Sequence, residues 1–355
     1  MGSGLVALDV VISSHPQISP KFWAGGSCGN VLTILAYLGW ESYPVAALRE
    51  GPQAEALVSD LRQWGVDTSL ICLSSSGSTP IIVEKILTDR NGLAWHRFEW
   101  TCPRCGSWLP RYRPLSARLA AEANEKAPEA HVFYFDRPST GALELAKQSK
   151  EQGAVVVFEP PSARHGALFR ECLEVADVLK YSHERLEDAG DQLERFRGVL
   201  EIETLGPQGL RFRRGSKRRS RWRTQDASPV DELRDAAGAG DWCTAGVIYA
   251  LCREGRAGLD DATDETVWSG LSFGQALASM NCRYEGARGS MYSIPREDFE
   301  ALVKGIWNSG DTTPQSVDAD SWLEELLTHV ECICPKCTAP GRRKATAPAR
   351  RARKP

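Results

Sequence analysis

The segment from residue 235 to 241 holds the residues best suited to chemistry. It reads Asp-Ala-Ala-Gly-Ala-Gly-Asp and precedes an apolar run, residues 242–252, that is typical of a buried helix. Glycines at a helix start let the backbone approach an anion, which the free N–H groups and the helix dipole attract. Asp241 could take a proton from an attacking hydroxyl while the turn holds a phosphoryl group. Spacing alone leaves open the alternative of a glycine-rich helix start with an ordinary aspartate.

Four cysteines form two C-x-x-C knuckles. Cys102 and Cys105 enclose Pro-Arg, and Cys334 and Cys337 enclose Pro-Lys. Each knuckle turns two sulfurs toward one point, so two knuckles supply the four thiolates of a structural Zn²⁺ site. The fold must bring the pairs together, because they lie far apart in the sequence. Four thiolates leave no open coordination position, so this zinc would have no catalytic role; redox-active pairs or two unrelated turns are the alternatives.

Strand-like and helix-like runs alternate through the middle of the chain. This alternation predicts βαβ units, and the β runs are apolar throughout, as strands covered on both faces are. The sequence therefore predicts an α/β fold, in which helices cover both faces of a mostly parallel central sheet. The predicted strands are 131–135, 154–158, 178–181 and 199–204, and the predicted helices between them are 140–152, 164–176 and 184–196.

Elements on either side complete this pattern. Residues 5–12 are strand-like, and residues 80–87 and 93–100 predict two strands joined by a turn, so the first 100 residues could supply a small β lid. A hairpin is predicted at 210–224, with eight basic residues between Arg211 and Arg223. Helices are predicted at 29–38, 54–64, 239–252, 265–280, 296–307 and 320–330, and a linker at 305–316.

Composition sets the limits on these interpretations. The chain has 355 residues, of which 42% are hydrophobic and 25% charged, and its net charge is −3. No apolar run approaches the ~20 residues that cross a bilayer, and the start has neither a basic segment nor an apolar one typical of a secretory signal. With eleven cysteines and no signal, we expect reduced thiols and a cytoplasmic location.

Several segments, in order, look like motifs of the ribokinase-like (PfkB) carbohydrate kinase family. The segment 235–241 resembles the family's GAGD motif, and residues 25–30, Gly-Gly-Ser-Cys-Gly-Asn, resemble its N-terminal diglycine segment. The other matches are Leu8-Asp9 at the end of the first strand, the GVDT segment 65–68, the T-x-G-x-x-G nucleotide loop 204–209 and the late Gly286-Ala287 pair. The resemblance covers about residues 4–305 and implies a three-layer sandwich with a small β lid.

The resemblance also implies roles for individual residues. The implied reaction transfers phosphate from ATP, with Mg²⁺, to a hydroxyl of a sugar or nucleoside-like acceptor. Asp241 would be the base, and Gly238, Ala239 and Gly240 would form the anion hole. The acceptor pocket would be lined by Asp9, Gly25, Gly26 and Asn30, and the nucleotide would be contacted by Thr204, Gly206 and Gly209.

Departures from the family pattern leave some roles open. The family often carries N-x-x-E before the nucleotide loop, whereas residues 180–185 here read Lys-Tyr-Ser-His-Glu-Arg. Glu184 falls one residue early but could still organise the metal through water, and Arg185 takes the expected place. The family's first strand normally begins a few residues upstream of Gly4, so the start of the chain could be truncated or misassigned, and a short central strand would cost stability. Arg137 could clamp an anionic group of the acceptor or form a surface ion pair.

The chain divides into three parts under this interpretation. We expect a kinase domain at 1–310, with lid strands from about 5–25 and 80–100, then a C-terminal helix and zinc knuckle at 311–337. Residues 338–355, with seven basic side chains and no acid, predict a disordered tail. The knuckles are not general in the family and indicate a zinc-binding subfamily. Family members often dimerise through the lid, but a zinc-tied tail could change that surface and leaves the oligomeric state open.

Two further sets of residues have more than one interpretation. Asn281, Arg283 and Arg288 flank the Gly286-Ala287 pair and could touch the nucleotide, or serve as buried caps and salt links. The basic hairpin and tail could bind nucleic acid, or be solvated charged segments. A binding protein that has lost phosphoryl transfer, and that docks nucleic acid or a protein partner through the zinc knuckles and basic segments, is therefore the alternative function; the intact turn at Asp241 opposes it.

Overall fold

The computed structural model describes residues 1–355 except 16, 91–93, 165, 216–219, 310–333 and 339–355. The predicted helix 320–330, most of the predicted linker, and the basic tail beyond residue 338 therefore lie outside the described residues. None of the described helices is both long and apolar enough to cross a membrane.

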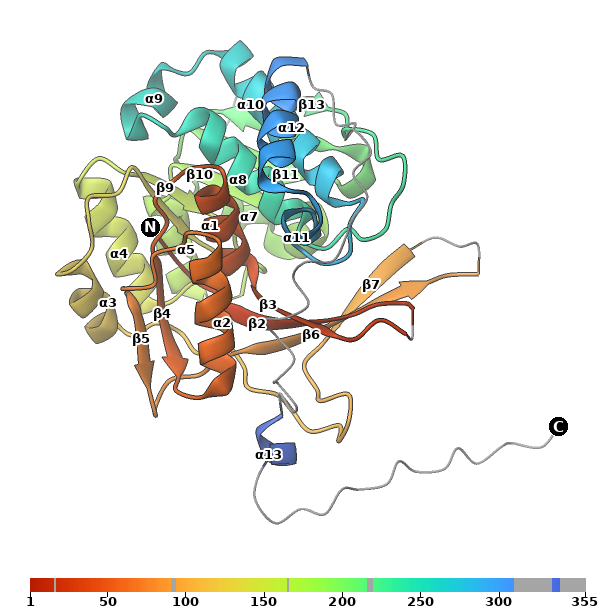
Figure 1. Ribbon diagram of the computed structural model, residues 1–355. Helices are drawn as coiled ribbons and strands as arrows, with labels where there is room; N and C mark the ends of the chain where they lie inside the picture. Colours follow the sequence, from red (N-terminus) through yellow and green to blue (C-terminus); the bar gives the residue numbers. More distant parts are fainter. Residues whose placement is uncertain (16, 91–93, 165, 216–219, 310–333, 339–355) are drawn as a thin grey trace.

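A nine-stranded sheet forms the centre of the described structure (Figure 1). Seven neighbouring strands of the sheet pair in parallel, and the two strands at one edge form an antiparallel hairpin. In spatial order the strands are β13 (Arg223–Gln225), β12 (Leu210–Arg214), β11 (Leu200–Thr204), β10 (Val178–Ser182), β9 (Val155–Phe158), β8 (Val132–Phe135), β1 (Gly2–Ser3), β4 (Pro44–Arg49) and β5 (Ile71–Ser74).

Helices cover both faces of this sheet, as predicted, because its strands send apolar side chains to both sides. On β8, Tyr134 belongs to one buried cluster, whereas Phe133 and Phe135 belong to the other. The first cluster packs under α1 (Ser27–Tyr37), α2 (Pro52–Gln63), α8 (Ala239–Leu251), α9 (Gly255–Asp261), α10 (Asp264–Asn281) and α12 (Arg296–Ser309). The second packs under α3 (Ala117–Asn124), α4 (Thr140–Glu151) and α5 (Gly166–Val175).

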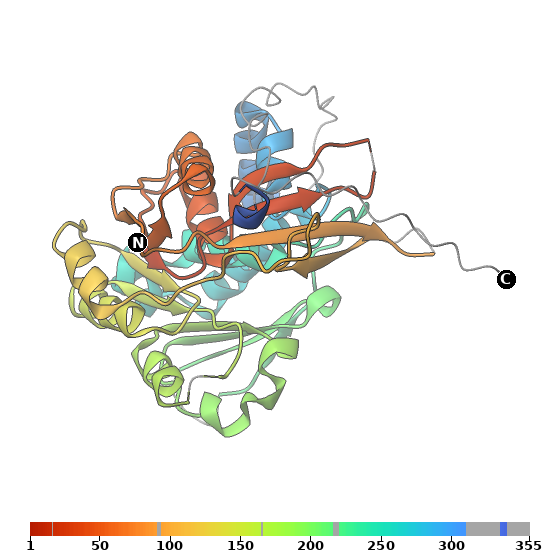
Figure 2. The same cartoon turned by 90° about the horizontal axis from the view of Figure 1, so that it is seen from below.

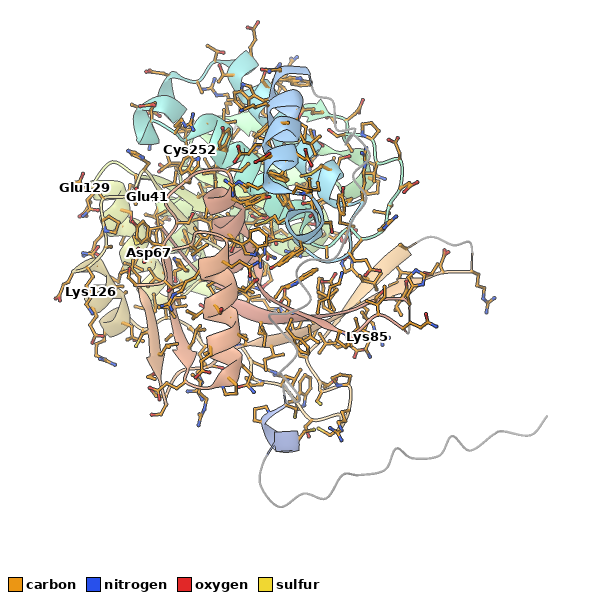
Figure 3. The ribbon with its side chains drawn as sticks, viewed as in Figure 1. Glu41, Asp67, Lys85, Lys126, Glu129 and Cys252 are labelled. Carbon is orange, nitrogen blue, oxygen red and sulfur yellow. The ribbon has the colours of Figure 1, made fainter. Side chains whose placement is uncertain are left out.

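A separate four-stranded sheet projects from this body (Figures 1 and 2). Its order is β3 (Lys21–Gly25), β2 (Ala7–Ile12), β6 (Ile81–Thr88) and β7 (Ala94–Glu99), which confirms the predicted lid strands. Lys85, labelled in Figure 3, lies on this sheet, where its Nζ is 2.7 Å from a carboxylate oxygen of Glu99 on the paired strand. Asp9 lies in the middle of β2 of this small sheet rather than at the end of the first strand.

Two other predictions need correction or refinement. The helix predicted at 184–196 is broken into α6 (His183–Leu186), a 3₁₀ turn (Glu187–Ala189) and α7 (Gly190–Leu193). Gly190 has φ 31°, and this positive value, which suits glycine, interrupts the helix. The central strand at the start of the chain is short, since β1 contributes only two residues between β4 and β8.

Candidate active site

The glycine turn before α8 has a conformation that only glycine fits comfortably. Gly238 precedes the helix with φ 72°, and a Cβ there would lie 2.2 Å from the carbonyl oxygen of Ala287. Gly240 is exposed and Asp241, in the first turn of α8, is half-buried, so the turn opens to solvent. Backbone N–H groups at an open helix start can receive an anion beside this carboxylate.

Asp241 is held by a side chain from a distant helix. The amide Nδ2 of Asn30, on α1, donates a hydrogen bond of 2.8 Å to its Oδ2. Burial and the negative charge of Glu159 raise the pKa of Asp241 to about 7, although the Asn30 hydrogen bond and the charge of Lys180 act in the opposite direction. A carboxylate that titrates near neutral pH is suited to accept a proton and release it again.

A buried ion pair links the turn to the central sheet. The ammonium of Lys180, on β10, donates to Glu159 Oε1 at 2.6 Å and to the carbonyl oxygen of Gly240 at 3.1 Å. Thr244 on α8 donates to the other oxygen of Glu159 at 2.6 Å. Although burial lowers it, the charge of Glu159 raises the pKa of Lys180, so the side chain stays protonated. The pair therefore anchors the first turn of α8 to the central sheet.

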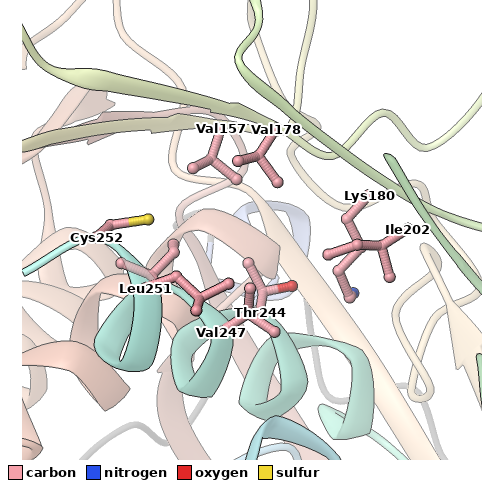
Figure 4. Close-up of a pocket in the computed structure, with 9 residues that line it drawn as sticks. Val157, Val178, Lys180, Ile202, Thr244, Val247, Leu251 and Cys252 are labelled. Atoms are coloured by element: carbon pink, nitrogen blue, oxygen red, sulfur yellow. The ribbon is translucent and has the colours of Figure 1, made fainter. Parts of the chain in front are cut away.

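A small cavity lies beside this ion pair, between the sheet and α8 (Figure 4). Its walls are mostly apolar and include Val157, Val178 and Cys252, with Lys180 and Thr244 at one end. It belongs to the packing under the turn, because the residues around it are core strand and helix positions.

Asp9 lies against the diglycine segment. Its Oδ2 accepts a 3.3 Å hydrogen bond from the backbone N–H of Gly26, and a Cβ on Gly25 would lie only 1.8 Å from that oxygen. The other oxygen, Oδ1, is buried and has no hydrogen-bond partner among the described residues. Burial raises the pKa of Asp9 to about 7.

Arg288 connects these two carboxylate regions. Its side chain is 1% exposed, and its Nη2 is 2.8 Å from Asp60 Oδ2. Its Nε donates to Asn30 Oδ1 at 3.2 Å, and since a guanidinium can only donate, this contact turns the NH₂ group of Asn30 toward Asp241. Like Asp9 Oδ1, the buried Nη1 of Arg288 has no hydrogen-bond partner in the described part of the chain.

The interpretation of Arg288 and Asn281 as buried links is the one that the structure favours. Arg288 forms the ion pair just described, and Asn281 Oδ1 accepts hydrogen bonds from the backbone and hydroxyl of Ser290. Arg288 was a candidate from the sequence, but nothing in the sequence indicated that it would contact Asn30. Its partner Asp60 and the Lys180–Glu159 pair carry no motif that would have revealed them.

The remaining predicted site residues lie at the end of β11, in the turn that follows it, and on α6. Thr204 ends β11, and Gly206 and Gly209 follow with φ 61° and 93°. Glu184 is exposed on α6, and the charge acting on Asp241 from this helix is that of Arg185.

Arg137 forms the ion pair that the sequence left as an alternative to substrate binding. Its Nη1 is 2.6 Å from Asp136 Oδ2. Asp136 is fully buried, and its Oδ1 accepts a hydrogen bond from the N–H of Leu5 at 2.9 Å.

The four knuckle cysteines converge, as predicted. Cys102 Sγ is 4.0 Å from Cys337 Sγ, Cys105 Sγ is 3.7 Å from Cys334 Sγ, and all four sulfurs lie within 4.8 Å of one another. A tetrahedral ion with zinc–sulfur bonds of ~2.3 Å separates its ligands by about 3.8 Å, so the donor set fits Zn²⁺. The cluster joins α13 (Pro335–Thr338) to the loop that follows β7 (Figure 1).

The described part of the basic hairpin is largely neutralised by acids. Arg211 pairs with Glu203 and Arg213 with Glu201 across the β11–β12 ladder, and Arg214 and Arg223 both reach Asp264 on α10. The guanidiniums of Arg211 and Arg213 also lie over the ring of Trp222, at 4.7 and 4.5 Å from its centroid. These contacts favour a structural role for the described hairpin residues.

Comparisons with known proteins find a related sequence and several similar folds. No family model matches the chain. It is 25% identical over 315 residues to a ketohexokinase from Mus musculus, covering 81% of this chain and 96% of that protein. A ribokinase from Giardia lamblia superposes with a TM-score of 0.64 at 17% identity over 86% of this chain and 98% of its own. An ATP-bound fructokinase from Xylella fastidiosa gives 0.62 at 20% identity, over 80% and 92%. The fold is therefore ribokinase-like, and the sequence is similar to that of a ketohexokinase.

Proposed function

We propose that the chain transfers the γ-phosphoryl group of ATP to a hydroxyl of a sugar or nucleoside-like acceptor, giving a phosphate ester and ADP. The observation that carries this proposal is the half-buried Asp241 at an open glycine turn, with its carboxylate oriented by Asn30. Structural neighbours include an aminoimidazole riboside kinase with its riboside and an ATP analogue, and a nucleoside kinase with inosine. These relatives support both acceptor classes.

The proposed mechanism assigns separate tasks to the turn and to the acid. The N–H groups of Gly238, Ala239 and Gly240 receive the charge that develops on the transferring phosphoryl oxygens. Asp241 removes the proton from the acceptor hydroxyl as that oxygen attacks phosphorus, and the bond from phosphorus to ADP breaks. Lys180 holds the carbonyl of Gly240 and keeps the N–H groups of the turn in position.

The acceptor would lie between Asp241 and Asp9. The free oxygen of Asp9 and the free Nη1 of Arg288 are a buried acceptor and a buried donor, each lacking a partner among the described residues. A polyol hydroxyl can accept from the guanidinium and donate to the carboxylate, which would satisfy both groups. Arg137 stays a proposed contact for an anionic acceptor group only if it leaves Asp136.

The nucleotide would lie on the loop containing Thr204, Gly206 and Gly209. Mg²⁺ prefers a few carboxylates, waters and phosphates, and Glu184 is an exposed carboxylate that fits a water-mediated role. When bound, the cation would neutralise charge on the ATP phosphates. No step of proton transfer depends on it.

A turnover assay with Mg-ATP across a panel of sugars and nucleosides tests the proposed function. ADP release that requires one acceptor and is lost in Asp241→Asn would support it. No turnover with any acceptor, combined with ATP-independent nucleic-acid binding that weakens steeply with salt, would support the binding-protein alternative instead.

The pH dependence should report the raised pKa of Asp241. Because only the ionised carboxylate accepts a proton, kcat/KM should rise with pH and level off above about 7, falling about tenfold per unit below pH 6. Asp9 also titrates at about 7, so Asp9→Asn is the control. Persistence of the acid limb in Asp9→Asn fits Asp241, whereas its disappearance would assign the limb to Asp9.

We also propose that the four cysteines hold one structural Zn²⁺. Cys105→Ser and Cys337→Ser should each lower the zinc content of purified protein by one ion per chain and lower the unfolding temperature, because the link between α13 and the loop after β7 is lost. Cys72→Ser, outside the cluster, is the matched control. Full stability of a protein without thiolate-bound zinc would contradict the proposal.

A further inference from the structure

A second group of metal-ligating side chains lies where the small sheet meets the phosphate-binding turn. Glu84 on β6, His96 on β7 and Asp235 at the start of the turn segment place their ligand atoms within 4.8 Å of one another. His96 Nδ1 is 3.0 Å from Asp235 Oδ1. Glu84 and His96 lie on paired neighbouring strands, whereas Asp235 is far from both in the sequence, and none of the three was singled out by a metal motif.

Glu84 is the unusual member of this group. Its side chain is buried, with 1% exposure, and neither carboxylate oxygen has a hydrogen-bond partner in the part of the chain that the structure describes. Asp235, by contrast, accepts from the backbone N–H groups of Ala237 at 2.9 Å and Gly286 at 2.8 Å. A buried carboxylate without a donor is costly, so Glu84 needs either a proton or a cation.

No basic side chain among the described residues balances the charge of Glu84, which leaves room for a bound cation. Two buried acids face a single histidine that is 24% exposed, and no described lysine or arginine forms an ion pair with Glu84. Imidazole nitrogen together with carboxylate oxygens is a ligand set that Zn²⁺ and Mn²⁺ accept, whereas the four-cysteine cluster is a soft thiolate set. The two groups therefore differ in the metals that they should take.

We propose that Glu84, His96 and Asp235 form a binding site for a divalent cation such as Mn²⁺ or Zn²⁺. Two ligands come from the small sheet and one from the segment that leads into the glycine turn, so the cation links the two parts. Asp235 already fixes the turn through Ala237 and Gly286, and the cation adds strands β6 and β7 to that support. The proposal is independent of the proposed kinase reaction.

The site can be tested by titrating nucleotide-free full-length protein that carries a single Zn²⁺ per chain, enough for the four cysteines alone, with Mn²⁺ and following the spectrum of the free ion by electron paramagnetic resonance. We expect one bound Mn²⁺ per chain in the wild type. The isosteric Glu84→Gln and the more exposed His96→Ala should each weaken binding at least about tenfold. Glu285, whose charge acts on Glu84 but which is not one of the three ligands, accepts a hydrogen bond from Ser13; Glu285→Gln should leave the affinity within about threefold of the wild type.

Thermal unfolding provides the second measurement. Mn²⁺ should raise the unfolding temperature of the wild type and of Glu285→Gln but not that of His96→Ala, since binding to the folded state alone stabilises it. No Mn²⁺ bound by the wild type would mean that Glu84 and Asp235 share a proton instead, and would overturn the proposal. Equal affinity in the wild type and His96→Ala would overturn it as well.

Discussion

Asp241→Asn should lower kcat by about a hundred-fold to ten thousand-fold while leaving the fold intact. Asparagine has nearly the same shape, and its oxygen can still accept the hydrogen bond that Asn30 Nδ2 donates at 2.8 Å. It cannot accept a proton from the substrate hydroxyl. The loss should therefore appear in kcat and kcat/KM together, with KM for ATP little changed, as measured by steady-state kinetics on the acceptor found in the panel.

Two controls keep this result interpretable. The unfolding temperature of Asp241→Asn should equal or exceed that of the wild type, because a half-buried carboxylate is replaced by a neutral amide. Asn30→Ala should retain more activity than Asp241→Asn, since it removes only the group that orients the base. A kcat for Asp241→Asn within about tenfold of the wild type would show that proton transfer at this residue is not needed, and would contradict the assigned role.

The glycine turn, the diglycine segment and the cysteine knuckles could be predicted from the sequence because each lies in a short segment. The turn at Gly238 has to contain glycine, as a Cβ would meet the carbonyl of Ala287, and the same holds for Gly25 beside Asp9. The two cysteine knuckles could be assigned to one site from the sequence, because a tetrahedral zinc site needs four thiolates. The confirmed strands and helices likewise follow from apolar periodicity within the elements.

Contacts between segments that are far apart in the sequence could not be predicted in this way. Arg288, Asp60 and Asn30 meet in space although nothing in their local sequence marks them as partners. The Lys180–Glu159 pair has no spacing signature either, because its members end up side by side only through strand pairing. The two-residue strand β1 is too short to show a pattern, and the helix predicted at 184–196 had suitable apolar spacing but contains Gly190.

Arg288→Met should be the most destabilising single change near the site. It removes one partner of a buried ion pair and leaves Asp60, which is 5% exposed, without its guanidinium. Breaking a buried pair in this way costs about 3–5 kcal/mol of unfolding free energy, to be measured by denaturant titration. Arg118→Met removes an exposed partner of Glu122 on α3 and should cost less than about 1 kcal/mol.

Activity separates a positioning role of Arg288 from a purely structural one. Arg288→Lys keeps the charge next to Asp60 but replaces the planar group that contacts Asn30 and Asp60 together, so stability should largely recover while kcat stays low. The orientation of Asn30 would then be free, and with its oxygen turned toward Asp241 the acid limb of the pH profile should move to higher pH, because the charged carboxylate loses its donor. Recovery of both kcat and the wild-type pH profile in Arg288→Lys would show that the residue supports only the fold.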